Sequence, residues 1–309
     1  MVNVAIAGGT GNVGRTIVEI FKAQKRHQAF LLTRSSNPSD IGIPVIQVDY
    51  SDPESLTSAL EKNNIHTVVS CVSYEGDALK VAQMNLIRAS SKSSATKRFI
   101  PSTFGIAYPA DAVEDLPMLS DYFAAFDELK KSGLEWTSFH NGTFLDYWAM
   151  PHIKTFLRPM WMSIDIPSRM AAIPGDGNSR FTLTYSYDAA KYLVALMDLD
   201  TWPETSRVAG DIVTWHEFLK LVEEVTGERF KVTYDSVENL KKFQPTDLPS
   251  HALSYEDFPK DQFRWFLSII SRWTTDEDVC YIPGELNSKF PEIKPMSLKG
   301  MLEAYWKGK

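Results

Sequence analysis

The first residues of the chain constrain its fold more than any later segment. Residues 2–7 form an apolar run that predicts a buried strand, and they lead directly into residues 8–14, where glycines recur with the spacing G-x-x-G-x-x-G. Apolar side chains then follow at Val13, Ile17 and Phe21, the spacing of one helix face. A strand, a glycine-rich turn and a helix N-terminus present backbone N–H groups to an anion, so this order predicts a pyrophosphate site. The alternative is a tight strand–helix turn that binds no ligand.

Alternating strand and helix patterns continue through the first half of the chain. Further strands are expected at residues 29–33, 45–48, 67–72, 98–100 and 134–139, with helices from residue 12, from residue 52, and over residues 77–90 and 118–131. Strands this apolar, separated by helices, need a parallel sheet that is covered on both faces. We therefore predict an α/β fold.

The alternation loosens after about residue 150. Strands are expected at residues 207–213 and 230–234, with helices from residue 188 and over residues 214–227, 255–272 and 297–306. We predict a nucleotide-binding domain over residues 1–150 and a mainly substrate-binding lobe over residues 151–309, with elements at about residues 185–215 returning to the main sheet. The lobe is expected over the C-terminal edge of the sheet, where ligands bind in open α/β folds.

The composition of the chain argues against several classes of function. The net charge of −7 disfavours a nucleic-acid partner, because phosphate binding needs a basic surface. Cys71 and Cys280 are too few for a disulfide framework or a cysteine metal cluster, and the histidines lack metal-ligand spacing, so no metal is expected. No apolar stretch reaches the ~20 residues that span a bilayer, and the first strand leaves no room for a signal peptide. We expect no membrane partner and a cytoplasmic location.

The end of the second predicted strand indicates which dinucleotide is preferred. An acidic residue here would bind a free ribose 2′-hydroxyl, but the segment reads T-R-S-S at residues 33–36. Arg34 can pair with a 2′-phosphate, and the hydroxyls of Thr33, Ser35 and Ser36 add donors. The segment therefore predicts NADP(H) as the cofactor; the alternative is an ordinary surface arginine.

Several segments together resemble one known family. They are residues 8–14, Arg34, residues 97–105 (K-R-F-I-P-S-T-F-G), residues 133–137 with 141–144, and residues 286–295. These segments resemble the NmrA-like and isoflavone-reductase-like proteins, atypical short-chain dehydrogenases/reductases, and the last resembles the fungal branch. The F-I-P-S-x-F-G run is the most specific, and the match covers nearly the whole chain. The resemblance implies a Rossmann-like, doubly wound parallel sheet with a smaller C-terminal substrate lobe, NADP(H), and reduction of small, often aromatic or alkaloid-like metabolites.

The resemblance also assigns roles to individual residues. Within the first turn the pyrophosphate would be held by Gly8, Thr10, Gly11, Asn12 and Val13, and the 2′-phosphate by Arg34. The nicotinamide ribose would be bordered by Cys71, Val72 and Ser73, and the nicotinamide ring by Asn141, Thr143 and Phe144. The substrate pocket is predicted to be lined by Tyr74, Phe104 and Tyr147.

The chain departs from its family at the expected catalytic position. Plant reductases of this family carry a lysine about 11 residues before the G-[IL]-x-[YW]-T segment, and Tyr122 stands there. Phe126 occupies the lysine position of the wider superfamily's Tyr-x-x-x-Lys pair, and Thr103 stands where the family often has glutamate. Tyr122 and His140 are the predicted catalytic proton donors. The alternatives are a core tyrosine, since Tyr122 shares helical spacing with apolar neighbours, and a packed histidine.

Three functions remain open at this point. The first is an NADPH-dependent reductase of a small organic substrate with an imine or iminium, or a carbonyl or enone, as acceptor. The second is a non-redox isomerase or cyclase on the same fold. The third is an NADP-binding, NmrA-like regulator or redox sensor without catalysis. The expected partner is a small-molecule substrate, and a homodimer is one open assembly state.

Overall fold

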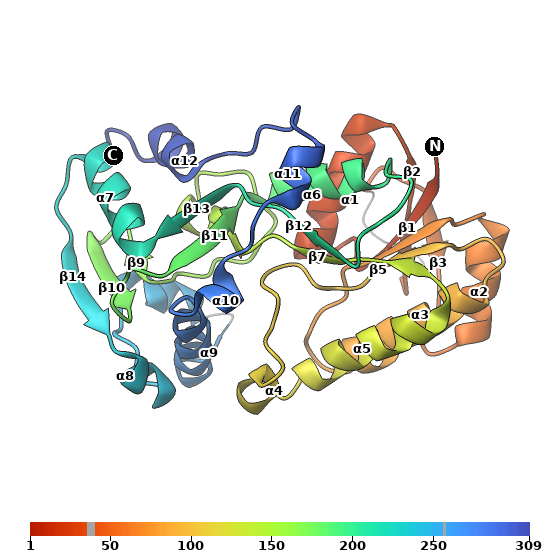
Figure 1. Ribbon diagram of the computed structural model, residues 1–309, viewed down its shortest axis with the longest axis horizontal. Coiled ribbons are helices and arrows are strands. Elements are labelled where there is room, and N and C mark those ends of the chain that lie inside the picture. The colour runs from red at the N-terminus through yellow and green to blue at the C-terminus, as the bar shows by residue number, and fades with distance from the viewer. Residues whose placement is uncertain (36–40, 256–257) are drawn as a thin grey trace. The chain divides into compact units, whose positions relative to one another are not determined.

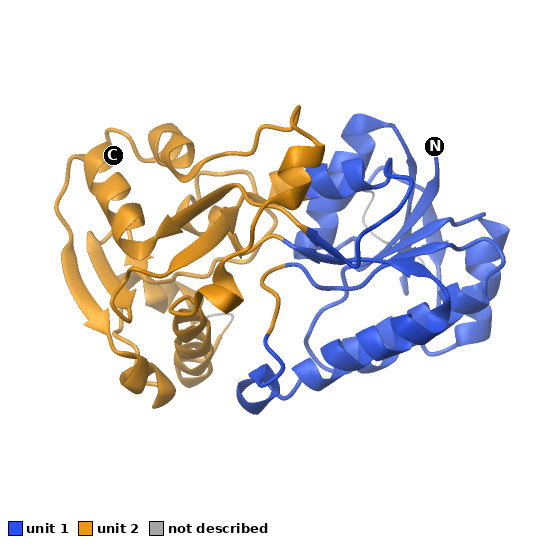
Figure 2. Cartoon of the chain, in the orientation of Figure 1, with its two compact units in different colours: residues 1–104, 109–140, 190–206 blue, residues 105–108, 141–189, 207–309 orange. Residues whose placement is uncertain are grey.

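The chain folds into two compact units. The computed structural model describes residues 1–35, 41–255 and 258–309. Unit 1 comprises residues 1–104, 109–140 and 190–206, and unit 2 comprises residues 105–108, 141–189 and 207–309 (Figure 2). The chain passes from unit 1 to unit 2 several times; the passage nearest the boundary expected at residue 150 falls between His140 and Asn141.

Unit 1 is built on a parallel sheet. Its strands are β1 (Asn3–Ala7), β2 (Gln28–Thr33), β3 (Val45–Gln47), β4 (Thr67–Ser70), β5 (Arg98–Ile100) and β6 (Glu135–Trp136). Its helical segments are α1 (Asn12–Gln24), α2 (Pro53–Lys62), the π-helical turn η1 (Ala78–Gln83), α3 (Met84–Lys92), α4 (Ala112–Asp115) and α5 (Leu119–Ser132). Among the described residues these six strands pair in the order β3-β2-β1-β4-β5-β6, all in parallel. The predicted parallel α/β fold is confirmed.

Helices cover both faces of this sheet, as its apolar strands require. Figure 1 shows α1 on one face and α2, α3 and α5 on the other. In β1 the side chains from Val4 to Ala7 are fully buried. The start of α2 is set by Asp52, whose carboxylate accepts the N–H groups of Glu54 and Ser55 at 3.0 Å, and by Pro53 in the first turn.

The predicted sixth strand divides in two at Thr137. Its second part, β7 (Ser138–His140), pairs with β12 (Thr205–Arg207) in a separate two-stranded ladder. The N–H of Ser138 donates to the carbonyl of Glu204 at 2.8 Å instead of continuing the main ladder. Residues 190–206 thus return to unit 1, but within the described residues none of their strands joins the six-stranded sheet.

Unit 2 contains two smaller sheets and a set of helices. Its strands are β8 (Thr143–Phe144), β9 (Ile164–Asp165), β10 (Met170–Pro174), β11 (Arg180–Thr184), β13 (Asp211–Thr214) and β14 (Lys231–Asp235), which pair as β14-β10-β9 and β13-β11-β8. The helical segments are η2 (Leu145–Trp148), α7 (Trp215–Thr226), α8 (Val237–Lys241), η3 (Pro249–Ser254), α9 (Lys260–Trp273), α10 (Glu277–Cys280), α11 (Glu285–Lys289) and α12 (Leu298–Tyr305), while α6 (Ser186–Leu196) begins in unit 2 and ends in unit 1. The core includes Trp215, whose ring centroid lies 4.3 Å from that of Phe181 and 5.9 Å from that of Trp148.

The strand expected at residues 207–213 is interrupted, and a side chain explains why. The amide of Asn287 accepts the N–H of Ala209 at 3.1 Å and donates to the Ala209 carbonyl at 2.7 Å. Because both backbone groups of Ala209 are used in this way, β12 ends before it; the chain then enters β13, which pairs with β11 in a different sheet. The helix expected over residues 255–272 is α9; residues 256–257 of that prediction lie outside the described residues.

Candidate functional site

The glycine-rich turn packs the end of β1 against the end of β4. Gly8 has φ +73°, and a Cβ built on it would overlap the carbonyl group of Cys71. A Cβ on Gly14 would overlap the carbonyl oxygen of Gly8. Gly11 differs from both, since its φ is −86° and its Cβ would meet only the Gly8 carbonyl oxygen, at 3.3 Å. Gly8 and Gly14 are therefore required by the fold, whereas glycine at Gly11 chiefly keeps an exposed surface open.

The N-terminus of α1 is uncapped. Its N-cap residue, Gly11, gives no side-chain cap hydrogen bond, and the first turn holds no acidic residue. In contrast, α2 and α7 are capped by the side chains of Asp52 and Thr214. Thr10, Gly11 and Asn12 are exposed. The first-turn N–H groups and the positive end of the helix dipole thus face outward, an arrangement that suits a diphosphate.

The end of β2 carries the predicted phosphate-binding arginine. Arg34 is exposed, and the hydroxyl of Thr33 accepts the N–H of Ser35 at 3.2 Å, which orders the backbone around it. Burial raises the pKa of Tyr50, and the nearby Arg34 guanidinium opposes that rise. Ser36 lies outside the described residues. The guanidinium and hydroxyl groups here match the chemistry of a ribose 2′-phosphate.

The loops that follow β4 and β5 are fastened to each other through Ser102. Its hydroxyl donates to the carbonyl of Val72 at 2.9 Å, and the hydroxyl of Tyr74 donates to the carbonyl of Ser102 at 2.8 Å. The N–H of Cys71 donates to the carbonyl of Ala7 at 2.8 Å, and burial raises the pKa of its thiol, which makes that thiol a poor nucleophile. Ser73 is exposed. The predicted nicotinamide-ribose segment is thus held rigidly at the C-terminal edge of the sheet.

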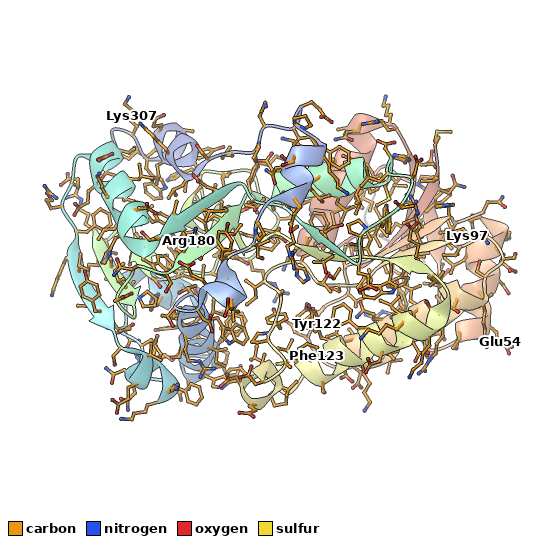
Figure 3. All side chains as sticks on the ribbon, viewed as in Figure 1. Glu54, Lys97, Tyr122, Phe123, Arg180 and Lys307 are labelled. Carbon is orange, nitrogen blue, oxygen red and sulfur yellow. The ribbon has the colours of Figure 1, made fainter. Side chains whose placement is uncertain are left out.

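Tyr122 lies in the first turns of α5, where Figure 3 labels it beside Phe123. The residue is 3% exposed. Its ring centroid lies 5.2 Å from that of Phe123, 5.0 Å from that of Phe126 and 6.2 Å from that of Tyr74. The structure therefore brings together the predicted catalytic tyrosine and one predicted pocket residue, Tyr74. An aromatic ring, that of Phe126, packs where the wider superfamily has a lysine.

The second predicted catalytic residue, His140, and the predicted pocket residue Phe104 also belong to unit 1. His140 is buried at the end of β7. The ring of Phe104 packs 5.8 Å from that of Phe139, and the hydroxyl of Thr103 accepts the Phe139 N–H at 2.8 Å. Thr103, which stands where relatives often carry glutamate, therefore joins the loop after β5 to β7.

The remaining predicted residues belong to unit 2. The N–H groups of Asn141 and Gly142 both donate to the Gly105 carbonyl at 3.0 Å, and Thr143 with Phe144 forms β8 against β11. The ring of Tyr147 lies 6.3 Å from that of Phe144. Burial raises the pKa of Tyr147, with a smaller contribution from a neighbouring carboxylate. Within unit 2, contacts thus hold together Tyr147 and the loop that is predicted to border the nicotinamide ring.

The carboxylate beside Tyr147 is that of Asp146, a residue that was not predicted from the sequence. It is fully buried and accepts hydrogen bonds from the Thr155 hydroxyl at 2.7 Å and from the hydroxyl and N–H of Ser186 at 2.6 and 2.9 Å. Burial raises its pKa, and these hydrogen bonds oppose the rise. Asp146 thereby ties the turn after β8 to the start of α6. A lone acid in the apolar run L-D-Y-W was the available signal.

Two negative observations apply to residues 1–35, 41–255 and 258–309. Within them, no helix is both long and apolar enough to cross a membrane. The same residues contain no cluster of three histidine, cysteine or carboxylate side chains that could bind a metal ion.

Comparison with known proteins identifies the family. The NmrA-like family matches residues 2–264. The chain belongs to the NmrA-like family. "Oxidoreductase BOA1" of Botryotinia fuckeliana (strain B05.10) is 34% identical over 298 residues, covering 96% of this chain and 96% of that protein. "Oxidoreductase swnN" of Metarhizium robertsii (strain ARSEF 23 / ATCC MYA-3075) is 34% identical over 339 residues, covering 99% and 98%. The predicted family and the predicted enzyme class, an oxidoreductase, are confirmed.

Solved structures share the fold of this NmrA-like chain. Leucoanthocyanidin reductase from Vitis vinifera, described as a binary complex with NADPH, has a TM-score of 0.72 at 20% identity and covers 98% of this chain and 99% of its own. Isoflavone reductase has a TM-score of 0.73 at 17% identity with the same coverage. At these identities the likeness extends to the fold, so the predicted Rossmann-like architecture is confirmed.

Proposed function

We propose that this protein is an NADPH-dependent reductase of a small organic substrate. The observation that carries the proposal is the uncapped N-terminus of α1, which stands one strand away from the exposed Arg34 at the end of β2. Two anion-binding features at the same sheet edge fit a dinucleotide that carries a diphosphate and a 2′-phosphate. The NADPH complex of leucoanthocyanidin reductase and the names of the 34%-identical oxidoreductases support the same cofactor and reaction class.

Each part of the site has a defined task in this proposal. The first-turn N–H groups of α1 bind the diphosphate, Arg34 binds the 2′-phosphate, and the rigid loop at Val72 and Ser73 orients the nicotinamide end. NADPH, when bound, supplies a hydride. These roles require no metal ion.

The proton donor limits the class of substrate. Tyr122 packs among aromatic rings, and no lysine occupies either family position. These positions therefore supply no cation to lower the pKa of a tyrosine that acts as the acid. An imine that is already protonated, an iminium ion, carries its positive charge into the site and needs no proton in the reducing step. A carbonyl or enone would need one, for which the phenol of Tyr122 and the imidazole of His140 are the candidates. Imines and iminium ions are therefore the favoured acceptors, with carbonyls and enones second.

Turnover assays test this proposal. The protein should oxidise NADPH in the presence of a cyclic imine, with a panel of ketones and enones as the comparison. Consumption of NADPH with an imine, and formation of the amine in equal amount, supports the proposal. Turnover of a substrate without net loss of NADPH would show a non-redox enzyme. Binding of NADPH without turnover of any acceptor, together with capture of a protein partner, would show a regulator.

A further inference from the structure

An unsatisfied polar group lies beside the loops that follow β4 and β5. Gln83 ends the π-helical turn η1 and is 1% exposed, yet its Nε2 has no hydrogen-bond acceptor anywhere in the part of the chain that the structure describes. A buried donor without an acceptor is costly and calls for an explanation. A π-helical turn that leads into an α-helix, as η1 leads into α3, is common at functional sites.

The orientation of this amide is settled by its other end. The Oε1 atom of Gln83 accepts the N–H of Ser102 at 2.8 Å, and only the carbonyl oxygen of an amide can accept. The two hydrogens of Nε2 are therefore the unpaired donors. Ser102 in turn bonds to Val72, so Gln83 lies at the C-terminal ends of β4 and β5. This is the edge at which open parallel sheets bind ligands.

The strand order indicates which half of a dinucleotide this amide would meet. In the sheet, β2 lies on one side of β1, whereas β4 and β5 lie on the other. A dinucleotide with its diphosphate at the start of α1 and its 2′-phosphate at Arg34 must extend its other half across β4 and β5. The nicotinamide nucleotide therefore lies on the side of Gln83.

We propose that Gln83 is a binding residue for the nicotinamide half of NADP(H), an inference that rests on the proposed cofactor. Its Oε1 holds the loop after β5, and its Nε2 donates to an oxygen of the nicotinamide nucleotide. Ser73 and residues 75–77, which connect β4 to η1, are exposed. Because Gln83 is 1% exposed, its Nε2 can reach a bound nucleotide only after a local shift of the surrounding chain.

Fragment binding tests the proposal. The replacement Gln83→Met keeps the length of the side chain but removes both polar atoms. Calorimetry should show that it weakens NADP⁺ binding about tenfold, the value of one hydrogen bond, while 2′,5′-ADP, which lacks the nicotinamide nucleotide, binds as in the wild type. Ser90→Ala is the matched control, because the hydroxyl of Ser90 on α3 is also buried without an acceptor. It should bind both ligands normally.

A second variant gives a signature that a purely structural role would not produce. Gln83→Glu keeps an acceptor for Ser102, but its carboxylate cannot donate, whereas the protonated acid can. The ratio of variant to wild-type NADP⁺ affinity should therefore rise as the pH is lowered. The ratio for 2′,5′-ADP should stay constant, since protonation of the phosphates affects both proteins alike.

Four results would count against the inference. Wild-type NADP⁺ affinity in Gln83→Met, or an equal loss of affinity for NADP⁺ and 2′,5′-ADP, overturns it. If Gln83→Met does not fold, a pH-independent affinity ratio in Gln83→Glu overturns it instead. A wild-type protein that binds neither ligand refutes the proposed function itself, and the inference with it.

Discussion

Replacement of Gly11 by alanine separates the two possible reasons for the glycine-rich turn. The backbone of Gly11, at φ −86°, suits any residue, and its new methyl group would lie 3.3 Å from the Gly8 carbonyl oxygen. A small shift relieves that contact. Alanine caps a helix less well than glycine but restricts the unfolded chain, and these opposed effects of up to about 1 kcal/mol each largely cancel. The free energy of unfolding should therefore stay within about 1 kcal/mol of the wild-type value.

The same methyl group stands where a diphosphate would approach the first turn of α1. Loss of two hydrogen bonds to a charged group, at about 1.5–3 kcal/mol each, predicts an NADP⁺ affinity at least about 100-fold lower. Thermal unfolding without cofactor and calorimetric titration with NADP⁺ measure the two effects separately. We expect a Tm within about 4 °C of the wild type, and a large loss of binding.

Gly8→Ala is the contrasting variant. Gly8 has φ +73°, and its Cβ would overlap the Cys71 carbonyl, so this change should lower the Tm clearly; the left-handed backbone alone costs roughly 1–2 kcal/mol. If Gly11→Ala instead binds NADP⁺ as tightly as the wild type, the turn only joins β1 to α1. The reasoning on the diphosphate site would then be refuted.

Three further predictions concern Arg34, Tyr122 and His251, the last a buried residue of η3 whose ring centroid lies 5.1 Å from that of Phe263. Arg34→Ala should weaken NADP⁺ binding roughly tenfold or more with little effect on NAD⁺ binding. The control Arg88→Ala, which removes an exposed arginine from α3, should change the affinity for neither dinucleotide. Equal losses of NADP⁺ affinity in both variants would remove Arg34 from the site. Tyr122→Phe should slow kcat about 10²-fold with a carbonyl substrate, and an unchanged kcat would show that this hydroxyl is not the acid. Burial lowers the pKa of His251 from 6.5 to about 4, so the neutral ring stabilises the folded state above pH 6.5 and that stability is lost as the pH falls toward 4. In chemical denaturation the wild-type free energy of unfolding should fall by about 3 kcal/mol between pH 7 and pH 4, and that of His251→Gln should fall by less. Identical pH profiles of the two proteins would contradict this prediction.

The parallel sheet and its cofactor turn could be predicted because their signals are local. The apolar run at residues 2–7, the glycines at residues 8–14 and the cap at Asp52 each act within a few positions of the chain. Their spacing alone therefore indicates a strand, a turn and a helix. The F-I-P-S-x-F-G run placed the loop after β5 for the same reason.

Elements that depend on distant partners could not be predicted in this way. The break at Ala209 depends on Asn287, 78 positions away, and the end of β6 depends on the pairing of Ser138 with Glu204. The strands β8 and β9 have two residues each, too few to show an apolar alternation, and are stabilised by pairing within unit 2. Burial of Asp146 and Gln83 also arises only when separate segments meet. The predicted domain boundary, site roles, assembly state and location stay predictions.

The central claim is that the uncapped helix and Arg34 together bind a dinucleotide with a 2′-phosphate. Calorimetric titration of the purified wild-type protein with NADP⁺ and with NAD⁺ tests it most directly. We predict saturable binding of one NADP⁺ per chain, at least about tenfold tighter than NAD⁺, since one arginine–phosphate interaction distinguishes them. Equal affinities would contradict the role of Arg34, and the absence of heat with either dinucleotide would contradict the account as a whole.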